Sequence, residues 1–204
     1  MTEIAHLAAT LFRKAAGRKR LVAAIAGPPG AGKSTLVETL LPLLPEGSAA
    51  IVAMDGFHFD NAVLDARGLR ARKGAPETFD FAGFEALLKR IASEEGDVAV
   101  PVFDRAADLA RAGSAIIGPD VRFVIVEGNY LLLDEAPWSR LAPLFDYSVF
   151  LDVDEGELER RLVERWLEHG HDAEAARARA LSNDLPNARR VMAARRAADL
   201  VLKL

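Results

Sequence analysis

The sequence contains no cysteine, so it cannot form a disulfide, a thiolate metal site or a cysteine nucleophile. It also has no apolar run near the roughly 20 residues that span a bilayer. The first residues lack the basic start and the apolar core of a signal peptide. These absences predict a soluble, cytoplasmic protein that does not insert into a membrane.

The sequence also has no excess of basic residues. The 26 lysine and arginine residues are outnumbered by 30 aspartate and glutamate residues, which gives a formal net charge of −4. Proteins that bind nucleic acids usually carry a basic surface that neutralises phosphates, so we expect no nucleic-acid partner. The length of 204 residues suits a single domain over residues 1–204. The sequence does not set the oligomeric state, and a homodimer remains open.

One motif is present without a mismatch: the phosphate-binding loop G-x-x-x-x-G-K-[ST] at residues 27–34. An apolar segment precedes it, and a helix-forming segment follows from Thr35. In such a loop, backbone N–H groups bind the α- and β-phosphates, Lys33 reaches the β- and γ-phosphate oxygens, and the Ser34 hydroxyl ligates Mg²⁺. The motif predicts a nucleoside triphosphate with Mg²⁺, and the alternative is a chance glycine turn. The loop residues are Gly27, Pro28, Pro29, Gly30, Ala31, Gly32, Lys33 and Ser34.

Apolar segments alternate with amphipathic ones along most of the chain. This alternation predicts an α/β fold with a mostly parallel sheet, helices on both faces, and ligands at the carboxyl ends of the strands. The polar, weakly periodic stretch from residue 60 to 80 predicts a substrate-covering loop around residues 56–80. Strands are expected at residues 21–26, 49–54, 98–103, 121–126, 147–153 and 200–202, with helices before the first strand, over 81–92 and after Asp154.

Two acidic residues stand directly after predicted strands. Asp55 follows the second strand, where a carboxylate can face the γ-phosphate and act as the base that activates an acceptor hydroxyl. The alternative is an aspartate that caps a turn before Gly56. Glu127 ends the most hydrophobic strand, where a carboxylate can hold Mg²⁺ or contact substrate. A purely structural role for Glu127 is the alternative.

Several cations and one histidine are placed to assist phosphoryl transfer. Arg105 follows the third predicted strand, although a surface salt bridge is the competing interpretation. Arg72 either binds an anionic part of a substrate or is simply solvated in its loop. Arg165 shares a helix face with Arg161 and either closes over the phosphates or pairs with glutamates of its own helix. His58, close after Asp55, is either a substrate contact or structural.

These motifs together resemble the P-loop kinases of the phosphoribulokinase, uridine kinase and bacterial pantothenate kinase group. The resemblance covers nearly the full length and rests on residues 27–35, 54–58, 72–80 and 126–133. Within the group, the Met-Asp-Gly-Phe-His form of residues 54–58 is most similar to a bacterial subgroup of fructose transport system kinases. The pattern after Asp55 differs from that of uridine kinases, and the chain is shorter than pantothenate kinases.

The resemblance implies a P-loop NTPase fold of the nucleoside and nucleotide kinase type. It implies that Lys33, Ser34 and Thr35 serve ATP and Mg²⁺, and that Asp55 contacts or activates the acceptor hydroxyl. It further implies that the arginine-bearing helical segment, residues 155–190, is a lid. It adds support for His58, Arg72 and Tyr130 as substrate contacts.

We therefore predict a magnesium-dependent kinase that phosphorylates a hydroxyl of a small molecule, such as fructose or another sugar. A nucleoside kinase or a pantothenate-type kinase is the alternative. A nucleotide-driven regulatory or transport ATPase is an alternative of another class, although the guanine-reading Asn-Lys-x-Asp and the transporter signature Leu-Ser-Gly-Gly-Gln are missing. The predicted catalytic residues are Lys33, Asp55 and Arg165, the predicted metal ligands are Ser34 and Glu127, and the predicted substrate contacts are Asp55, His58, Arg72, Arg105, Glu127 and Tyr130.

Overall fold

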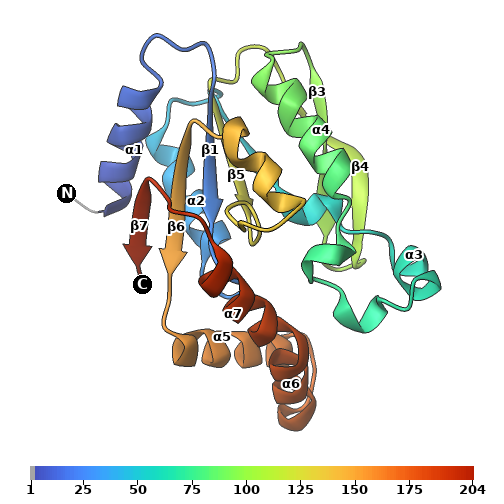
Figure 1. Cartoon of the computed structure of the whole chain (residues 1–204). Helices are drawn as coiled ribbons and strands as arrows, with labels where there is room; N and C mark the ends of the chain where they lie inside the picture. Colours follow the sequence, from blue (N-terminus) through green and yellow to red (C-terminus); the bar gives the residue numbers. More distant parts are fainter. Residues whose placement is uncertain (1–2) are drawn as a thin grey trace.

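The computed structural model describes residues 3–204 as strands and helices in alternation (Figure 1). The helices are α1 (Glu3–Lys14), α2 (Lys33–Leu40), α3 (Asn61–Ala66), α4 (Phe81–Ala92), α5 (Glu155–Glu168), α6 (Ala173–Arg179) and α7 (Leu185–Ala194). The strands are β1 (Leu21–Ala26), β2 (Ala49–Ala53), β3 (Val98–Asp104), β4 (Leu109–Ile117), β5 (Phe123–Gly128), β6 (Tyr147–Asp152) and β7 (Leu200–Lys203). Short 3-10 segments are η1 (Leu41–Leu43), η2 (Met54–Phe57), η3 (Arg70–Arg72), η4 (Pro76–Thr78) and η5 (Trp138–Leu144), and the π-helical turn η6 (Ala180–Asp184) joins α6 to α7.

Five strands form one parallel sheet in the order β2-β5-β1-β6-β7. The central strand β1 pairs with β5 on one side, Leu21 opposite Phe123, and with β6 on the other, Ala23 opposite Tyr147. All residues of β1 and β5 are buried, as is typical of parallel strands that helices cover on both faces. The prediction of a mostly parallel, doubly covered sheet is confirmed.

Alternate side chains of β1 enter two separate apolar cores. Leu21 and Ile25 pack in one core with buried residues of α1 and α2. Val22 and Ala26 pack in the other core with α4 and η5. Figure 1 shows α1 and α4 on opposite sides of the sheet. Because both faces are covered, the carboxyl ends of the strands are the place where the fold can receive a ligand.

Residues 98–103 form a strand as predicted, but this strand is not part of the central sheet. β3 pairs antiparallel with β4 in a two-stranded sheet, with Val98 opposite Ile117 and Asp104 opposite Leu109. The expectation that Arg105 follows a central parallel strand is therefore wrong, since Arg105 lies in the turn of a hairpin. The hairpin was not predicted from the sequence, because β4 is mostly exposed and rich in small and polar residues.

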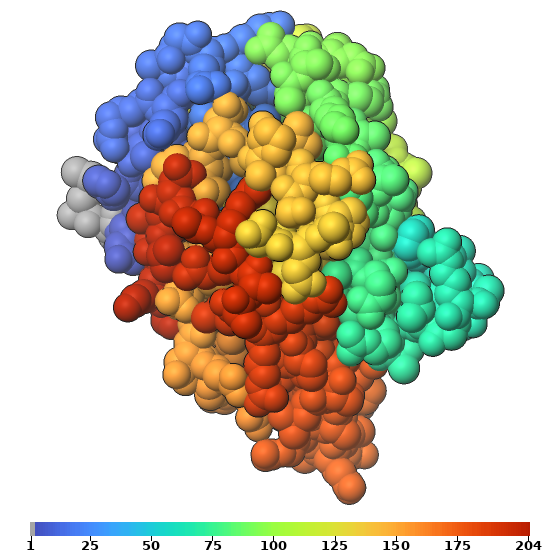
Figure 2. Space-filling view, in the orientation of Figure 1, coloured from blue at the N-terminus to red at the C-terminus, as the bar shows by residue number. Residues whose placement is uncertain are grey.

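The segment α5-α6-η6-α7, residues 155–194, forms a helical arm. Figure 2 shows the arm in orange and red, projecting from the body, with the α3 region projecting separately in teal. The arm begins where the sequence predicts, because the Asp154 carboxylate accepts a hydrogen bond from the Gly156 N–H at 2.9 Å. Asp172 caps α6 in the same way, through the N–H of Ala175.

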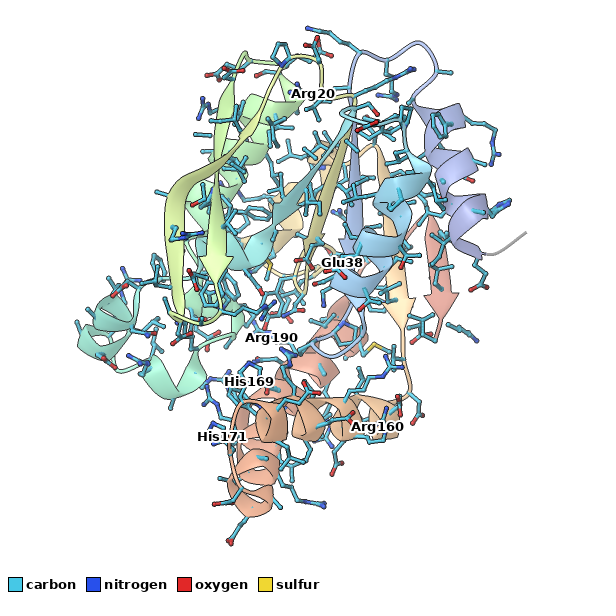
Figure 3. All side chains as sticks on the ribbon, turned by 180° about the vertical axis from the view of Figure 1, so that it is seen from behind. Arg20, Glu38, Arg160, His169, His171 and Arg190 are labelled. Atoms are coloured by element: carbon cyan, nitrogen blue, oxygen red, sulfur yellow. The ribbon has the colours of Figure 1, made fainter. Side chains whose placement is uncertain are left out.

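The other end of the sheet is closed by a buried arginine. Arg20 donates hydrogen bonds to the carbonyls of Ile91, Gly118 and Val121 at 2.8–3.1 Å. Figure 3 shows Arg20 at the end of the molecule opposite His169 and Arg190. Within residues 3–204, no helix combines the length and the apolar character that crossing a membrane requires.

Candidate active site

The loop between β1 and α2 depends on its glycines. Gly30 and Gly32 have φ angles of 83° and 87°, a left-handed conformation that glycine adopts without steric cost. A Cβ atom at Gly27 would lie 3.1 Å from the Leu151 carbonyl oxygen, so glycine keeps the loop close to the sheet. Residues 29–35 line a cavity of about 750 Å³, which we call the nucleotide cavity.

Lys33 stands at the start of α2 with its ammonium group buried in the site. Its Nζ donates to the carbonyls of Gly27 and Pro28, both at 3.0 Å, and to Oδ1 of Asn129 at 2.6 Å. Burial lowers the pKa of Lys33 to about 8, and the Glu127 carboxylate partly opposes this shift. The loop thus holds a cation, charged at neutral pH, against the wall of the nucleotide cavity.

Two glycines allow the two acidic residues to approach each other. A Cβ at Gly56 would lie 2.5 Å from the Pro101 carbonyl oxygen, and a Cβ at Gly128 would lie 2.5 Å from Cβ of Met54. Both separations are too short for real atoms, so η2 packs tightly between β3 and β5 only because these positions are glycine. This packing brings Asp55 and Glu127 to the same cavity.

The two carboxylates have different surroundings. Glu127 is buried, and this burial raises its pKa, assisted by the negative charge of Asp55 and opposed by Lys33. The Asp55 side chain is 25% exposed and accepts a hydrogen bond from Nη2 of Arg105 at 3.2 Å. Asp55 is therefore the carboxylate that an acceptor molecule can reach more directly.

The oxygen atoms near the loop suit a magnesium ion that keeps most of its ligands from phosphate and water. Ser34 and Thr35 are exposed in the first turn of α2, and with Glu127 they line the nucleotide cavity. Residues 3–204 contain no group of three His, Asp or Glu side chains that could hold a metal alone. Mg²⁺ bound beside a nucleotide usually takes only one or two protein ligands, so Ser34 and Glu127 fit this role.

A second cavity of about 380 Å³ adjoins the first, and we call it the acceptor cavity. Asp55 and Arg165 line both cavities and so mark their boundary. Molecules bound in the two cavities would meet beside these two side chains. The residues that line both are Pro29, Asp55, Arg105, Asn129, Arg165 and His169.

His58 forms part of an aromatic wall in the acceptor cavity. Its ring centroid lies 4.0 Å from that of Phe79 and 4.9 Å from that of Phe103. Its Nδ1 lies 2.8 Å from the Asp55 carbonyl oxygen. Burial lowers the pKa of His58, so the ring is neutral at pH 7 and offers a flat, weakly polar surface.

Lys73 joins three segments at the rim of the acceptor cavity. Its Nζ donates to Oδ1 of Asn61 at 2.7 Å, and to Oδ1 and the carbonyl oxygen of Asp108 at 2.7 and 2.8 Å. Its side chain is only 10% exposed. The three acceptors connect α3, the loop after η3 and the turn of the β3–β4 hairpin, so Lys73 shapes the cavity with its donors already used.

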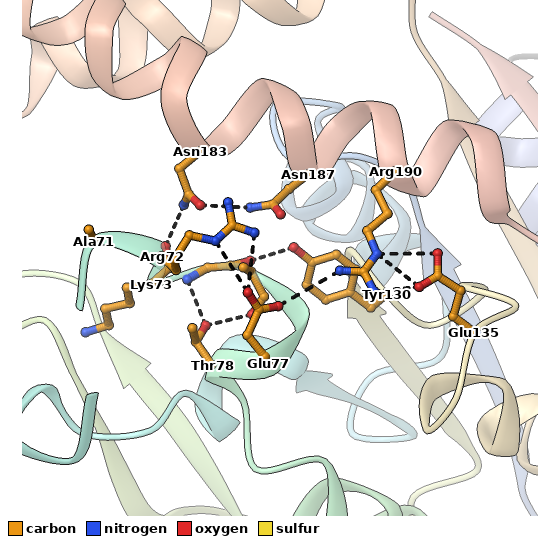
Figure 4. Close-up of polar contacts among 12 residues, drawn as sticks. Ala71, Arg72, Lys73, Glu77, Thr78, Tyr130, Glu135, Asn183, Asn187 and Arg190 are labelled. Carbon is orange, nitrogen blue, oxygen red and sulfur yellow. Dashed lines mark hydrogen bonds and ion pairs between the residues drawn. The ribbon is translucent and has the colours of Figure 1, made fainter. Parts of the chain in front are cut away.

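Arg72 and Tyr130 do not line either cavity. The Arg72 side chain is partly exposed and bonds to the Glu77 carboxylate at 3.3 Å (Figure 4). Tyr130 is fully buried, and its hydroxyl donates to the Gly74 carbonyl at 2.6 Å. The substrate contacts predicted for these two residues therefore have no support in the geometry. Tyr130 instead positions Gly74, which does line the acceptor cavity.

The helical arm also binds the loop that carries Lys73. Nη1 of Arg179 donates to the Ala71 carbonyl at 2.8 Å, and Nδ2 of Asn183 donates to the Lys73 carbonyl at 2.9 Å. Asn183 is buried and accepts a weaker bond from Nδ2 of Asn187 at 3.4 Å. Figure 4 shows Asn183 and the tyrosine hydroxyl approaching this loop from different elements. The loop also has backbone hydrogen bonds of its own, such as the one from the Ala75 N–H to the Arg72 carbonyl at 2.8 Å, and the side chains of the arm connect it to the rest of the molecule.

The arginines of α5 differ in their partners. Arg160 pairs with Glu157 and Glu164 along the helix, and Arg161 pairs with Glu157 at 2.6 Å. Arg165 has no carboxylate within 4.0 Å among residues 3–204, although it lines both cavities. Intrahelical pairing, the competing interpretation of these arginines, thus holds for Arg160 and Arg161 but not for Arg165.

The structure brings most of the predicted residues together. Sequence reasoning missed Asn129 and the arm residue Asn183. Asn129 was open to detection because it closely follows Glu127 at the end of β5, whereas Asn183 bonds to a residue 110 positions away. The Gly27 and Pro28 carbonyls hold Lys33. The predicted residues that line the acceptor cavity are Pro29, Asp55, His58, Arg105 and Arg165. Those that line the nucleotide cavity are Pro29, Gly30, Ala31, Gly32, Lys33, Ser34, Thr35, Asp55, Arg105, Glu127 and Arg165.

Comparisons with known proteins point the same way. Residues 22–203 match the family described as phosphoribulokinase and uridine kinase. An uncharacterized Escherichia coli K12 protein, YggC, is 39% identical over 192 residues, 92% of this chain and 79% of its own length. A Schizosaccharomyces pombe protein provisionally named a uridine kinase is 36% identical and covers 83% of this chain and 77% of its own. A crystal structure from Silicibacter sp. TM1040, provisionally described as a fructose transport system kinase, is 47% identical with a TM-score of 0.93, over 99% of this chain and 100% of that one.

Proposed function

Because the chain belongs to the phosphoribulokinase and uridine kinase family, and is thus an ATP-dependent phosphotransferase, we propose that it phosphorylates a hydroxyl group of a sugar or a similar small metabolite. The observation that carries this proposal is the meeting of two cavities beside Asp55 and Arg165. A phosphate-binding loop lines the larger cavity, and an aromatic wall lines the smaller one. This arrangement suits a nucleotide on one side and an organic acceptor on the other.

In the proposed reaction, the acceptor hydroxyl oxygen attacks the γ-phosphorus while the bond from that phosphorus to the β,γ-bridging oxygen breaks. Asp55 accepts the hydroxyl proton, and ADP leaves with the electron pair of the broken bond. Asp55 suits this step because it is partly exposed at the boundary and is oriented by Arg105 at 3.2 Å. Positioning and charge stabilisation are the main requirements of phosphoryl transfer.

Lys33 and Arg165 supply the positive charge in this mechanism. The three N–H donors of Lys33 are used by the Gly27 and Pro28 carbonyls and by Asn129, so in this proposal ATP binding replaces some of these bonds with bonds to the β- and γ-phosphate oxygens. Arg165 lies at the boundary without a carboxylate partner among residues 3–204 and is placed to neutralise charge on the transferring group. Ser34 and Glu127 would hold Mg²⁺, which supplies further charge neutralisation when bound.

Residues 56–80 and 155–190 serve, in this proposal, as the substrate loop and the lid of one domain. The bonds from Arg179 and Asn183 to the loop carbonyls support the idea, because they join the two segments beside the acceptor cavity. Water must be kept from the γ-phosphate if a kinase is not to act as an ATPase. The same proposal places the enzyme in the cytoplasm with a small-molecule substrate and no nucleic-acid partner, in line with the cysteine-free, acidic composition.

A sugar is the preferred acceptor because of the similarity to the Silicibacter protein, whose provisional description names a fructose transport system kinase. Nucleosides are the second candidate, since the related Schizosaccharomyces pombe protein is provisionally named a uridine kinase. The cavity volume of about 380 Å³ suits small molecules in general. Its many polar and charged lining groups suit an acceptor with several hydroxyls.

The direct test is ADP release from MgATP with single acceptors: sugars, polyols, nucleosides, pantothenate and glycerate, beside a reaction without acceptor. Stimulation by a sugar or a sugar derivative, lost in Asp55→Asn, is the expected result. Stimulation by a nucleoside alone would replace the sugar with the second candidate. Steady release that no acceptor changes would instead favour a nucleotide-driven regulatory or transport ATPase.

A further inference from the structure

We propose that the acceptor is an anion: a hydroxylated metabolite whose phosphate monoester or carboxylate group is bound by Arg179. This inference rests on the proposed kinase function and specifies its second substrate. Arg179 lines the acceptor cavity but not the nucleotide cavity, so it faces the part of the site that ATP does not share.

Positive side chains outnumber negative ones in the acceptor cavity. Ion pairs join Lys73 to Asp108 at 2.7 Å and Arg105 to Asp55 at 3.2 Å, which neutralises two cations by two carboxylates of the cavity. The cationic residues that line it are Arg70, Lys73, Arg105, Arg165 and Arg179, and the anionic ones are Asp55, Asp108 and Asp184.

The remaining charges are not evenly matched. Arg70 pairs with Asp65, which lies outside the cavity, at 3.0 Å. Neither Arg165 nor Arg179 has a carboxylate within 4.0 Å among the residues that the structure describes. The remaining acidic residue, Asp184, accepts a hydrogen bond from Nε1 of Trp166 at 2.6 Å and acts on Arg165 and Arg179 only from beyond ion-pair distance. The proposed mechanism gives Arg165 to the transferring phosphoryl group, which leaves Arg179 without an assigned anion.

Arg179 has two contacts that hold its side chain and leave most of its N–H donors free. Its Nη1 donates to the Ala71 carbonyl at 2.8 Å, and its guanidinium carbon lies 5.2 Å from the ring centroid of Trp166. A guanidinium has five N–H donors in a rigid plane, and only one is used here. Such a fork binds phosphate or carboxylate through two parallel hydrogen bonds. A fixed orientation lowers the entropy lost on binding.

The rest of the cavity suits the carbon skeleton of such an acceptor. His58, Phe79 and Phe103 provide the aromatic wall, and Asp55 stands at the boundary with the nucleotide cavity. An anionic group on Arg179 would therefore direct a hydroxyl at the other end of the molecule toward Asp55. A neutral sugar would leave the guanidinium without an ion-pair partner, since Asp184 lies beyond 4.0 Å from it.

The experiment compares matched neutral and anionic acceptors. ADP release is measured with fructose, fructose 1-phosphate, fructose 6-phosphate, gluconate and glycerate, for the wild type and for Arg179→Gln. Binding of each compound is measured by calorimetry with the protein saturated by a non-hydrolysable ATP analogue. Arg177→Gln is the control, because Arg177 lies on the same helix, pairs with Glu159 at 3.2 Å and lines neither cavity. Arg179→Lys keeps the charge but not the fork.

We expect at least one phosphorylated or carboxylated compound to exceed fructose in kcat/KM. Arg179→Gln should raise its KM by roughly 10- to 100-fold, the size of one lost hydrogen bond to a charged group, with the KM of ATP unchanged. Arg179→Lys should show a smaller rise and Arg177→Gln none. Comparing the phosphorylated compounds with the carboxylates gluconate and glycerate identifies which anion is bound.

Two results would overturn the inference. One is a neutral sugar that is used as well as its anionic counterparts, with equal effects of Arg179→Gln on both. The other is calorimetry in which no anionic compound binds in an Arg179-dependent way. Failure of the kinase proposal looks different: anionic compounds then bind in an Arg179-dependent way, but none of them stimulates ADP release.

Discussion

The two cavities that meet at Asp55 are built in different ways. One continuous stretch, residues 29–35, supplies much of the nucleotide cavity, and its conformation follows from a few glycines. The acceptor cavity collects side chains from η2, the substrate loop, the β3–β4 hairpin and the helical arm. A nucleotide site of this kind is thus set by local sequence, whereas the acceptor site depends on contacts between distant segments. Changing single side chains of the two sites tests this contrast.

The strongest test removes the central cation of the local site. We expect Lys33→Ala to reduce ADP release to the background level. Within residues 3–204, Lys33 is the only lysine that lines the nucleotide cavity. Steady-state ADP release and calorimetric titration with ATP measure the loss. Lys19→Ala is the control, since Lys19 is an exposed residue that lines neither cavity. Unaltered turnover would remove the proposed role of the phosphate-binding loop.

The next change affects the boundary between the cavities. Asp55→Asn should lower kcat by roughly 10²- to 10⁴-fold, the usual cost of losing an acid–base group, while the Kd of ATP stays nearly constant. Single-turnover kinetics and equilibrium ATP binding separate the two effects. Asp104→Asn serves as the control because Asp104 lies in the hairpin near Arg105 but lines neither cavity. A parallel loss of ATP affinity and kcat would indicate a structural aspartate.

The third test uses pH to change the local site alone. The pKa of Lys33 is about 8 because of burial, and bound phosphates must raise it, so ATP binding takes up a proton above that pH. We therefore expect ATP affinity to be constant below about pH 8 and to fall by up to about tenfold per pH unit above it. Calorimetry over this range measures the slope, and Lys33→Arg, which stays charged, should flatten it. An unchanged slope in Lys33→Arg would assign the proton elsewhere.

The smallest effect is expected at Tyr130, which supports the acceptor cavity through Gly74 without lining the cavity itself. Tyr130→Phe removes only the hydroxyl that bonds to the Gly74 carbonyl at 2.6 Å. We expect the KM of the acceptor to rise by roughly two- to tenfold, the size of one neutral hydrogen bond, with the KM of ATP unchanged. The matched control is Tyr147→Phe, the other tyrosine of the chain, which lines neither cavity. A change in the KM of ATP alone would contradict the separation of the two sites.

The sequence allows the local site to be predicted for a physical reason. A phosphate-binding loop is formed by neighbouring residues, and the acidic ends of buried strands meet at one edge of a parallel sheet. Lys33, Asp55 and Glu127 could therefore be placed together before the structure was known. The same reasoning wrongly placed the strand before Arg105 in the central sheet, yet Arg105 still reaches Asp55, because the hairpin packs against η2.

The acceptor site resisted prediction because its contacts have no local pattern. The bond from Asn183 to the Lys73 carbonyl joins residues 110 positions apart, and the bond from Arg179 to the Ala71 carbonyl joins residues 108 positions apart. Nothing in the stretch around Tyr130 distinguishes a buried tyrosine that supports a loop from one that contacts substrate. Long-range packing decides such roles, and the amino-acid pattern of one segment does not contain it.

The π-helical turn η6 makes the length of the arm matter more than its composition. It connects α6 to α7 without a break, and Asn183 lies within it. A π-helical turn is wider than an α-helical turn, so deleting one residue from η6 would let the segment close into a regular helix and would change the relative positions of Arg179, Asn183 and Asn187. A substitution at Arg179 or Asn183 would remove one bond to the loop carbonyls, whereas an insertion or deletion in η6 would displace one of these side chains relative to the other. Among natural relatives, the spacing between Arg179 and Asn187 should therefore tolerate substitutions far better than changes in length.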